Sequence, residues 1–439
     1  MSITLPESID EAFIAFVWEN QLLPSPNLLL HGGKACSVVQ PGRRNDHAGP
    51  DFTEARIRVG NITWAGHVEI HVRSSDWVRH QHQCDPAYNN VILHVVWVHD
   101  TEVRSANGRI PEVFEIRKWI SDDVLSRMNR LHFAKSGLPC GNAIHQVSAV
   151  EAISWLDRMM VERLEHRISV WKTLIKLCGD WDEAIYRMLC RSFGFHVNAL
   201  PFQWLAQRLP LKVIQKKRHD LMMIEAALFG TAGLLPPQSS HPYVSGLIEK
   251  YQYWLTIQKT PMMDGHVWKF LRMRPYNFPT FRMAQLAALL YAIPSFSGLV
   301  RDTEKVHDLL EKLELNASPF WKEHWHFKQN TKPHATCIGV NARIGIVVNT
   351  MAPALFAMGE AYEQQAWKER ALNWLQVLKP EDNHITRMFC QSPLEPVHSG
   401  HSQALFHLHD KYCQQKKCLI CNVGSAYLRA KEHPPDTAC

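Results

Sequence analysis

The chain has 439 residues, of which 46% are hydrophobic and 21% charged. This composition excludes a disordered or collagen-like chain and is enough for two or three domains. Lys and Arg number 48 against 42 Asp and Glu, and the net charge of +6 permits a polyanionic partner without requiring one. The 11 cysteines are an odd number, and residues 1–13 lack the layout of a signal peptide. We therefore expect reduced thiols or a metal site in a cytoplasmic protein.

The first hundred residues predict a small α/β core. Ser8 and Glu11 form a capping box that opens a helix over 9–20. Alternating or apolar runs predict the strands, and Ser74-Ser75-Asp76 begins a second helix before the last of them. The expected strands cover 35–40, 51–59, 62–73 and 91–98, with the second helix at 77–84.

Two carboxylates fall on neighbouring predicted strands. Asp51 opens one strand, Glu69 lies midway along the next, and His71 follows two residues later on the same face. Converging carboxylates make a hard-oxygen site for Mg²⁺ or Mn²⁺, and His71 could orient the attacking water. The alternative is that Asp51 caps a strand and Glu69 lies on a solvated face. His80 and His82 are two residues apart, so on a helix they would point in different directions and make a poor metal pair.

Pro50-Asp51 and Glu69-Ile70-His71, within a helix, three strands, a helix and a strand, resemble the PD-(D/E)XK nuclease superfamily. The resemblance covers residues 9–120. It implies that Asp51 and Glu69 bind the metal and that Glu19 is an accessory carboxylate on the first helix. His71 stands where the superfamily has lysine, and Arg73 would stabilise the charge that develops on phosphate.

Nearly the whole chain also resembles a bacterial family known only as a domain of unknown function, which implies no activity. The segments that carry this resemblance are 48–56, 67–71, 74–77 and 412–424.

Residues 121–400 predict a helical region, with a possible internal break at 234–242. The longest apolar stretches, 283–300 and 337–359, contain polar residues and are expected as buried helices, not membrane spans. Two basic segments could contact nucleic acid, although a solvated helix face or packing of an ordered loop would also explain them. Their candidate residues are Lys216, Lys217, Arg272, Arg274 and Arg282.

The carboxy-terminal tail, residues 401–439, carries Cys413-x4-Cys418-x2-Cys421. Three thiols within nine residues predict a site for Zn²⁺ or a [4Fe–4S] cluster. The fourth ligand is open: it could be His407 or His409 nearby, or the remote Cys140 or Cys390.

Together these patterns predict an α+β protein with a restriction-endonuclease-like core, a large helical region and a cysteine-rich tail. The leading hypothesis is a divalent-metal-dependent nuclease acting on DNA or RNA. One alternative is a catalytically inactive nucleic-acid-binding or scaffold protein, and another is a partner-binding helical protein with a structural zinc. The two nuclease-derived hypotheses require Asp51, Glu69 and His71 to face one site.

Overall fold

The computed structural model describes residues 9–23, 25–45, 47–133 and 137–430. Its contacts divide the chain into two compact units. The first unit contains Met1–Trp155, Arg387–Glu395 and Leu408–Cys439, and the second contains Leu156–Thr386 and Pro396–His407. These units differ from the expected boundaries at 120 and 400, because residues after 120 and the tail pack together with the N-terminal core.

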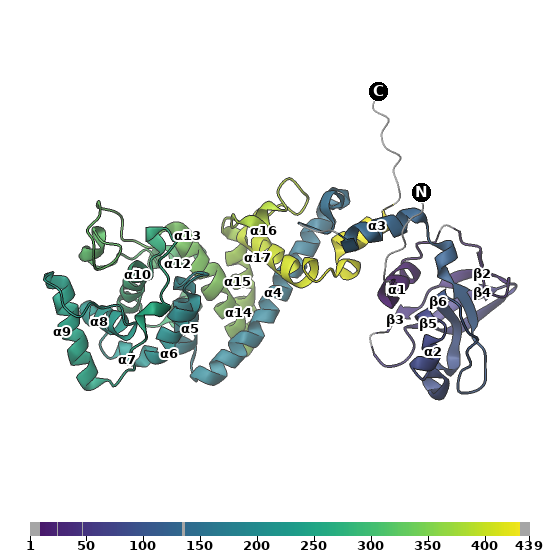
Figure 1. Ribbon diagram of the computed structural model, residues 1–439, viewed down its shortest axis with the longest axis horizontal. Coiled ribbons are helices and arrows are strands. Elements are labelled where there is room, and N and C mark those ends of the chain that lie inside the picture. Colours follow the sequence, from purple (N-terminus) through teal and green to yellow (C-terminus); the bar gives the residue numbers. More distant parts are fainter. Residues whose placement is uncertain (1–8, 24, 46, 134–136, 431–439) are drawn as a thin grey trace, which may run out of the picture. The chain divides into compact units, whose positions relative to one another are not determined.

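A seven-stranded mixed sheet forms the centre of the first unit (Figure 1). Its strand order is β1-β2-β4-β5-β6-β7, with β3 paired to β4. The strands are β1 (Leu28–Leu29), β2 (Ala35–Gln40), β3 (Arg43–Arg44), β4 (Phe52–Val59), β5 (Ile62–Arg73), β6 (Val91–Val98) and β7 (Glu112–Glu115). The chain is thus an α+β protein, and the strands expected from alternation all form.

Strand β5 lies between an antiparallel and a parallel neighbour. It runs antiparallel to β4 and parallel to β6, and Glu69 lies beside His94 in the β5–β6 register. Gly66 allows β5 to lie close to the start of β6, since a Cβ at this position would lie 2.6 Å from the carbonyl oxygen of Asn90. The β4–β5 pairing is irregular between Phe52 and Ala55, where Glu54 has a φ of +59°.

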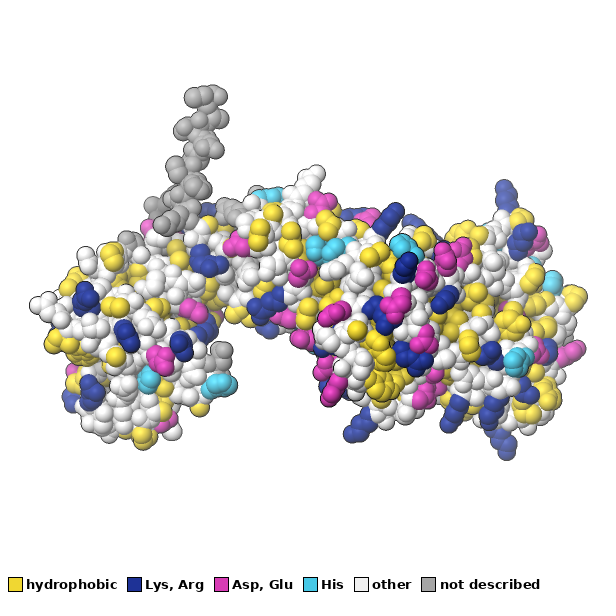
Figure 2. All heavy atoms as spheres, turned by 180° about the vertical axis from the view of Figure 1, so that it is seen from behind, with side chains coloured by type: hydrophobic (Ala, Val, Ile, Leu, Met, Phe, Trp, Pro, Cys, Tyr) yellow, Lys and Arg dark blue, Asp and Glu magenta, His cyan; other side chains and the backbone are white. Residues whose placement is uncertain are grey.

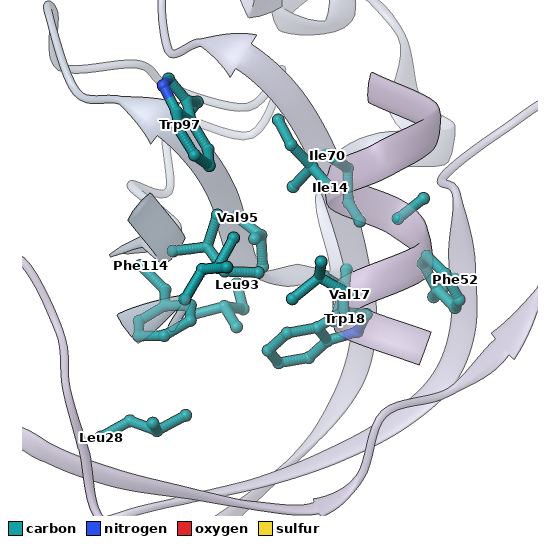
Figure 3. Close-up of a cluster of buried hydrophobic side chains, with 14 of the residues drawn as sticks. Ile14, Val17, Trp18, Leu28, Phe52, Ile70, Leu93, Val95, Trp97 and Phe114 are labelled. Atoms are coloured by element: carbon teal, nitrogen blue, oxygen red, sulfur yellow. The ribbon is translucent and has the colours of Figure 1, made fainter. Parts of the chain in front are cut away.

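Helix α1 (Glu11–Glu19) supplies the apolar layer on one side of this sheet. Ile14, Val17 and Trp18 point toward buried strand residues such as Ile70 and Val95 (Figure 3). Ser8 of the expected capping box lies outside the described residues. Among those described, the N-cap is Asp10, whose Oδ1 accepts a hydrogen bond from the Phe13 N–H at 2.9 Å.

The segment between β5 and β6 is broken into short helices, whereas a single helix over 77–84 was expected. They are α2 (Asp76–Arg79), η1 (His82–Cys84) and η2 (Pro86–Asn90). Gln81 separates the first two and has a left-handed backbone, with φ +63°. Trp77 and Tyr88 are buried here with Val91 and Val103 in a small separate core.

The carboxy-terminal segment completes the first unit. Helix α3 (Asp122–Phe133) packs with α18 (Asn422–Arg429), and Arg127 Nη1 donates to the Tyr427 carbonyl at 2.9 Å. A core formed by Phe16, Leu131, Cys418, Tyr427 and Leu428 joins these elements to α1. This packing explains why the tail is not a separate module.

The second unit is helical. Its boundary with the first falls within α4 (Ala149–Cys178), and the expected break at 234–242 is the connection between α8 and α9. The helices that follow α4 are α5 (Trp181–Phe193), α6 (Ala199–Arg208), α7 (Leu211–Gln215), α8 (Leu221–Thr231), α9 (Pro242–Ile257), α10 (Pro279–Ala292), α11 (Phe296–Asp302), α12 (Val306–Lys312), α13 (Val340–Ile346), the π-helical turn η8 (Val347–Met351), α14 (Ala352–Ala361), α15 (Gln365–Val377), α16 (His384–Arg387) and α17 (Ser399–Leu408).

One stretch of this unit, Val340–Ala361, is long and apolar enough to cross a membrane by length and composition. In the described structure 72% of its most apolar window is buried against other helices. Burial of this kind is typical of the central helix of a globular unit, as the sequence predicts.

Candidate functional site

Asp51 and Glu69 lie side by side at the junction of β4 and β5. The Asp51 N–H donates to Glu69 Oε2 at 3.1 Å, and the Ile70 N–H donates to Asp51 Oδ2 at 2.9 Å. Each carboxylate therefore uses one oxygen to hold the backbone and keeps the other, Asp51 Oδ1 or Glu69 Oε1, for a further partner. Glu69 is only 5% exposed, so it does not lie on a solvated face.

Two histidines, His71 and His82, lie close to the remaining oxygen of Glu69, and His80 lies beside these two rings. One ring nitrogen each of His71, His80 and His82 can be chosen so that all three lie within 4.8 Å of one another. His82 Nε2 lies 3.0 Å from Glu69 Oε1 without hydrogen-bond geometry, and His71 Nε2 lies 3.7 Å from the same oxygen. Two ligands bound at about 2.1 Å and at right angles on one ion are about 3.0 Å apart. The Glu69–His82 separation is thus that of two atoms on a common ion.

The left-handed backbone of Gln81 brings His80 and His82 together. On a continuous helix these side chains would diverge, but α2 ends at Arg79 and η1 begins at His82. His80 Nδ1 is 3.1 Å from His71 Nε2, and the His82 ring stacks on Tyr88 with centroids 3.8 Å apart. The expected divergence of this pair applied to a continuous helix, and the break at Gln81 instead places the two rings with centroids 5.6 Å apart.

A fourth histidine, His94, supports the group from β6. Its Nε2 is 2.8 Å from His71 Nδ1, and the residue is fully buried. With the proton of His71 on Nδ1 and donated to His94, the lone pair of His71 Nε2 faces the other imidazoles. A buried partner on the far ring nitrogen is the usual way in which a ligating histidine is oriented.

The electrostatics of the group favour a cation. Burial raises the pKa of Glu69 to about 9, and the neighbouring charges of Asp51 and Glu11 act in the same direction. Burial also raises the pKa of Asp51 and of Glu11. In contrast, burial lowers the pKa of His71 to about 2 and of His94 to about 3, and it lowers that of His82. Arg44 acts on Asp51 and Arg79 on Glu11, whereas no cationic side chain among the described residues lowers the pKa of Glu69. The buried imidazoles are therefore neutral donors beside a carboxyl, Glu69, whose missing counter-charge a bound divalent ion would supply.

The donor set modifies the metal expected from the sequence. Carboxylates alone suit Mg²⁺ or Mn²⁺, whereas imidazole nitrogens favour Zn²⁺ and other transition metals. Glu69 with His71, His80 and His82 offers one oxygen and three nitrogens, and Asp51 can add a second oxygen. These residues fit Mn²⁺ or Zn²⁺ better than Mg²⁺.

Two other predicted residues lie away from this group. Glu19 is at the carboxy-terminal end of α1 and pairs with Arg44 at 3.5 Å. The α1 carboxylate whose pKa is shifted by the charges of Asp51 and His80 is Glu11, which lies about 12 Å from Glu19 along the helix axis. Arg73 is largely exposed and lies 3.9 Å from Asp100. Nothing in the amino-acid pattern distinguishes Glu11, His82 or His94 as site residues, although histidines are dense in this region.

Four cysteines approach one another elsewhere in the first unit. Burial raises the pKa of the Cys413 thiol well above its usual range, and the nearby Cys421, Cys140 and Cys418 raise it further. Cys140 precedes η4 (Gly141–Gln146), whereas Cys418 begins η10 (Cys418–Ile420) and Cys421 caps α18. The fourth member of this thiol group is therefore Cys140.

Cys421 accepts backbone hydrogen bonds of the kind that often surround a metal-ligating sulfur. The backbone N–H groups of Val423 and Gly424 donate to it at the start of α18. Gly424 allows this turn to be tight, since a Cβ there would lie 2.3 Å from the carbonyl oxygen of Cys418. The two histidine candidates have other neighbours: His409 lies 3.3 Å from Asp410, and His407, in the second unit, lies 3.5 Å from Glu162.

The thiols are spread more widely than the imidazoles. Within the described residues, one nitrogen from each of the three imidazoles can be chosen so that all three atoms lie within 4.8 Å of one another. No three of the four sulfur atoms lie that close together. A single tetrahedral Zn²⁺ with bonds of about 2.3 Å would hold its sulfurs about 3.8 Å apart. The observed spacing is wider than a mononuclear zinc site needs.

The residues predicted to contact nucleic acid differ in their exposure to solvent. Arg272 and Arg274 are exposed, as is Lys216, whereas Lys217 is half-buried with its Nζ 5.8 Å from the Tyr253 ring centroid. Arg282 is only 7% exposed and faces inward. On the face seen in Figure 2, basic and acidic side chains are interspersed over the helical unit.

The fold and this site define an α+β protein in which a mixed sheet carries a buried carboxylate–histidine cluster and a large helical unit follows. The chain belongs to the family described as protein of unknown function (DUF2851), whose profile matches residues 11–384. No curated protein and no solved structure has significant similarity to it.

Proposed function

We propose that the chain is a divalent-metal-dependent phosphodiesterase that hydrolyses nucleic acid at the cluster formed by Asp51, Glu69, His71, His80 and His82. The observation that carries this proposal is a group of three imidazole nitrogens within 4.8 Å of one another, two of them beside the buried, uncompensated carboxyl of Glu69. The order of α1, antiparallel strands and a parallel β6 agrees with the resemblance to PD-(D/E)XK nucleases, which supports phosphodiesters as the substrate.

Each residue has a distinct part in this proposal. Glu69, His71, His80 and His82 would hold Mn²⁺ or Zn²⁺, which would supply a bound water of lowered pKa and a charge opposite the phosphate. Glu11 is half-buried with a raised pKa, which suits proton transfer to or from the reacting oxygens. His94 is a positioning residue for His71.

The test is hydrolysis of single-stranded DNA, double-stranded DNA and RNA by the full chain with Mn²⁺, Zn²⁺ or Mg²⁺. We expect cleavage with Mn²⁺ or Zn²⁺ and its loss in Asp51→Asn and His82→Ala. The matched control is Glu54→Gln, since Glu54 is a largely exposed carboxylate on β4. Metal binding without turnover on any of these substrates would favour the alternative of a catalytically inactive nucleic-acid-binding or scaffold protein.

We further propose that Cys140, Cys413, Cys418 and Cys421 hold a [4Fe–4S] cluster, not a zinc ion. The wide spacing of the sulfurs supports this assignment, because a cubane holds its four thiolates further apart than a single ion does. Anaerobically purified protein should contain iron and acid-labile sulfide, both lost in Cys140→Ser and kept in the exposed control Cys390→Ser. One zinc per chain, lost in the same variant, would show that the group is a zinc site.

The proposed compartment is the cytoplasm. None of the ten cysteines within the described residues belongs to a disulfide, which fits a reducing environment.

A further inference from the structure

A cavity of about 610 Å³ lies within the helical unit. Helices α4, α5, α6, α10 and α13 line it together with the π-helical turn η8 and the connection after α5. Its volume is that of a small-molecule site. Its lining contains Arg167, Arg191, Arg282 and His196, and no Asp or Glu.

Arg282 is the most deeply buried of these cations. It is 7% exposed, and its Nη1 and Nη2 donate to the amide oxygens of Gln285 and Asn277, each at 2.9 Å. Its Nε has no hydrogen-bond partner, and the guanidinium lies 4.6 Å from the ring centroid of Phe195. A guanidinium buried among neutral groups is costly unless an anion compensates it.

Arg167 has the same kind of surroundings. Both of its terminal nitrogens lie 3.3 Å from oxygens of Asn349, which belongs to η8. Burial lowers the pKa of Arg167 to about 9 and the nearby charge of Arg163 lowers it further, whereas the charge of Glu381, which does not line the cavity, acts in the opposite direction. π-helical turns are rare and occur often at functional sites, and this turn places a neutral acceptor where a carboxylate would neutralise the cation.

The mouth of the cavity is also basic. Arg191 is exposed and donates to the amide oxygen of Gln203 at 2.6 Å, and His196 is exposed beside it in the lining. Within the described residues, no carboxylate oxygen lies within 4.0 Å of Arg167, Arg191 or Arg282. The three guanidinium groups are thus oriented by amides, and each keeps donors for a ligand.

We propose that this cavity binds a small molecule carrying a phosphate group, with Arg167 and Arg282 as its inner contacts and Arg191 at the entrance. Guanidinium forks match the geometry of phosphate oxygens and bind them by paired, charge-assisted hydrogen bonds. The cavity lies in the unit that lacks the carboxylate–histidine cluster, so this inference does not depend on the proposed phosphodiesterase.

The test is calorimetric titration of the full chain, without added divalent metal, with inorganic phosphate, AMP and ATP. We expect at least one probe to bind, with its dissociation constant raised at least tenfold in Arg282→Gln and in Arg191→Gln. Arg301→Gln is the matched control, because Arg301 is a half-exposed arginine of the same unit that pairs with Asp302. Phosphate binding alone identifies the phosphoryl group as the recognised element, and tighter binding of AMP or ATP identifies a nucleotide.

Two results would overturn the proposal. The first is that none of the three probes binds at millimolar concentration. The second is that binding is unchanged in Arg191→Gln or in folded Arg282→Gln. Arg191 is exposed, so we expect its replacement to leave the fold intact, and this variant decides the outcome if Arg282→Gln does not fold.

Discussion

Replacing Glu69 with glutamine should make the metal-free first unit more stable at neutral pH, while abolishing its stabilisation by metal. Glu69 is buried, and its folded-state pKa of about 9 lies above the ordinary value of 4.5. Between these values the unfolded chain releases the proton and the folded chain keeps it. Stability from this group is therefore fully present below pH 4.5 and is lost as the pH rises to about 9.

The size of this stability loss follows from the difference between the folded-state and ordinary pKa values of Glu69. Each pH unit above 4.5 costs about 1.4 kcal/mol until the folded pKa is reached. At pH 7 the wild-type carboxyl has thus lost roughly 3 kcal/mol relative to pH 4.5. Glutamine has similar shape and no proton to release, so the variant should lack this loss. A divalent ion at 100 times its dissociation constant restores about 2.7 kcal/mol, in the wild type only.

The assay must report on the first unit alone, because unfolding of two units is not one transition. Chains are equilibrated in urea and EDTA at several pH values and then given a short deuterium pulse at one fixed pH. Mass spectrometry of peptides from β4 and β5 gives the midpoint for this sheet. Glu54→Gln, at an exposed position on β4, is the control.

The reasoning fails if wild type and Glu69→Gln show parallel pH dependences between pH 5 and 8. It also fails if Mn²⁺ or Zn²⁺ stabilises the variant as strongly as the wild type.

Three further predictions concern the same unit. His94→Ala should weaken metal binding about 10- to 100-fold without removing a ligand, since His94 orients His71; calorimetric titration with Zn²⁺ measures this. Gly66→Ala should lower the free energy of unfolding by about 1–3 kcal/mol in the pulse assay, because its Cβ collides with the backbone beside β6. Glu11→Gln should change the pH profile of hydrolysis, whereas Glu19→Gln should leave it unaltered.

Regular periodicity made much of the fold predictable. The strands at 35–40, 62–73 and 91–98 form with those bounds. Their alternating or continuous apolar residues can be buried against the core only if the segment is an extended strand in the sheet. Short edge strands such as β7 (Glu112–Glu115) were missed, since four residues carry little pattern. Helix α3 lies within the region expected to be helical, but its packing with the sheet unit was not predictable, because its buried face is covered by α18, about 300 residues later in the sequence.

The candidate site was predictable only where it follows a strand. The same-face relation of Glu69 and His71 comes directly from the two-residue period of β5. The positions of His80 and His82 depend on one left-handed residue, Gln81, which is neither glycine nor asparagine and gives no signal of its φ. The resemblance implies a carboxylate on the first helix but does not say on which turn of that helix it lies. Glu19 therefore falls at the far end of α1 from Glu11, the carboxylate whose charge acts on Asp51.

The discontinuity of the first unit affects how the chain is made. About 230 residues separate Trp155 from the first return of the chain to this unit at Arg387. At 5–20 residues per second, a ribosome needs roughly 10 to 50 s to add them. During that interval the nascent sheet has emerged, while Phe16 and Leu131 still lack Tyr427 and Leu428 to cover them. The helical unit can therefore fold to completion before the first unit is complete, although the first unit begins earlier in the chain.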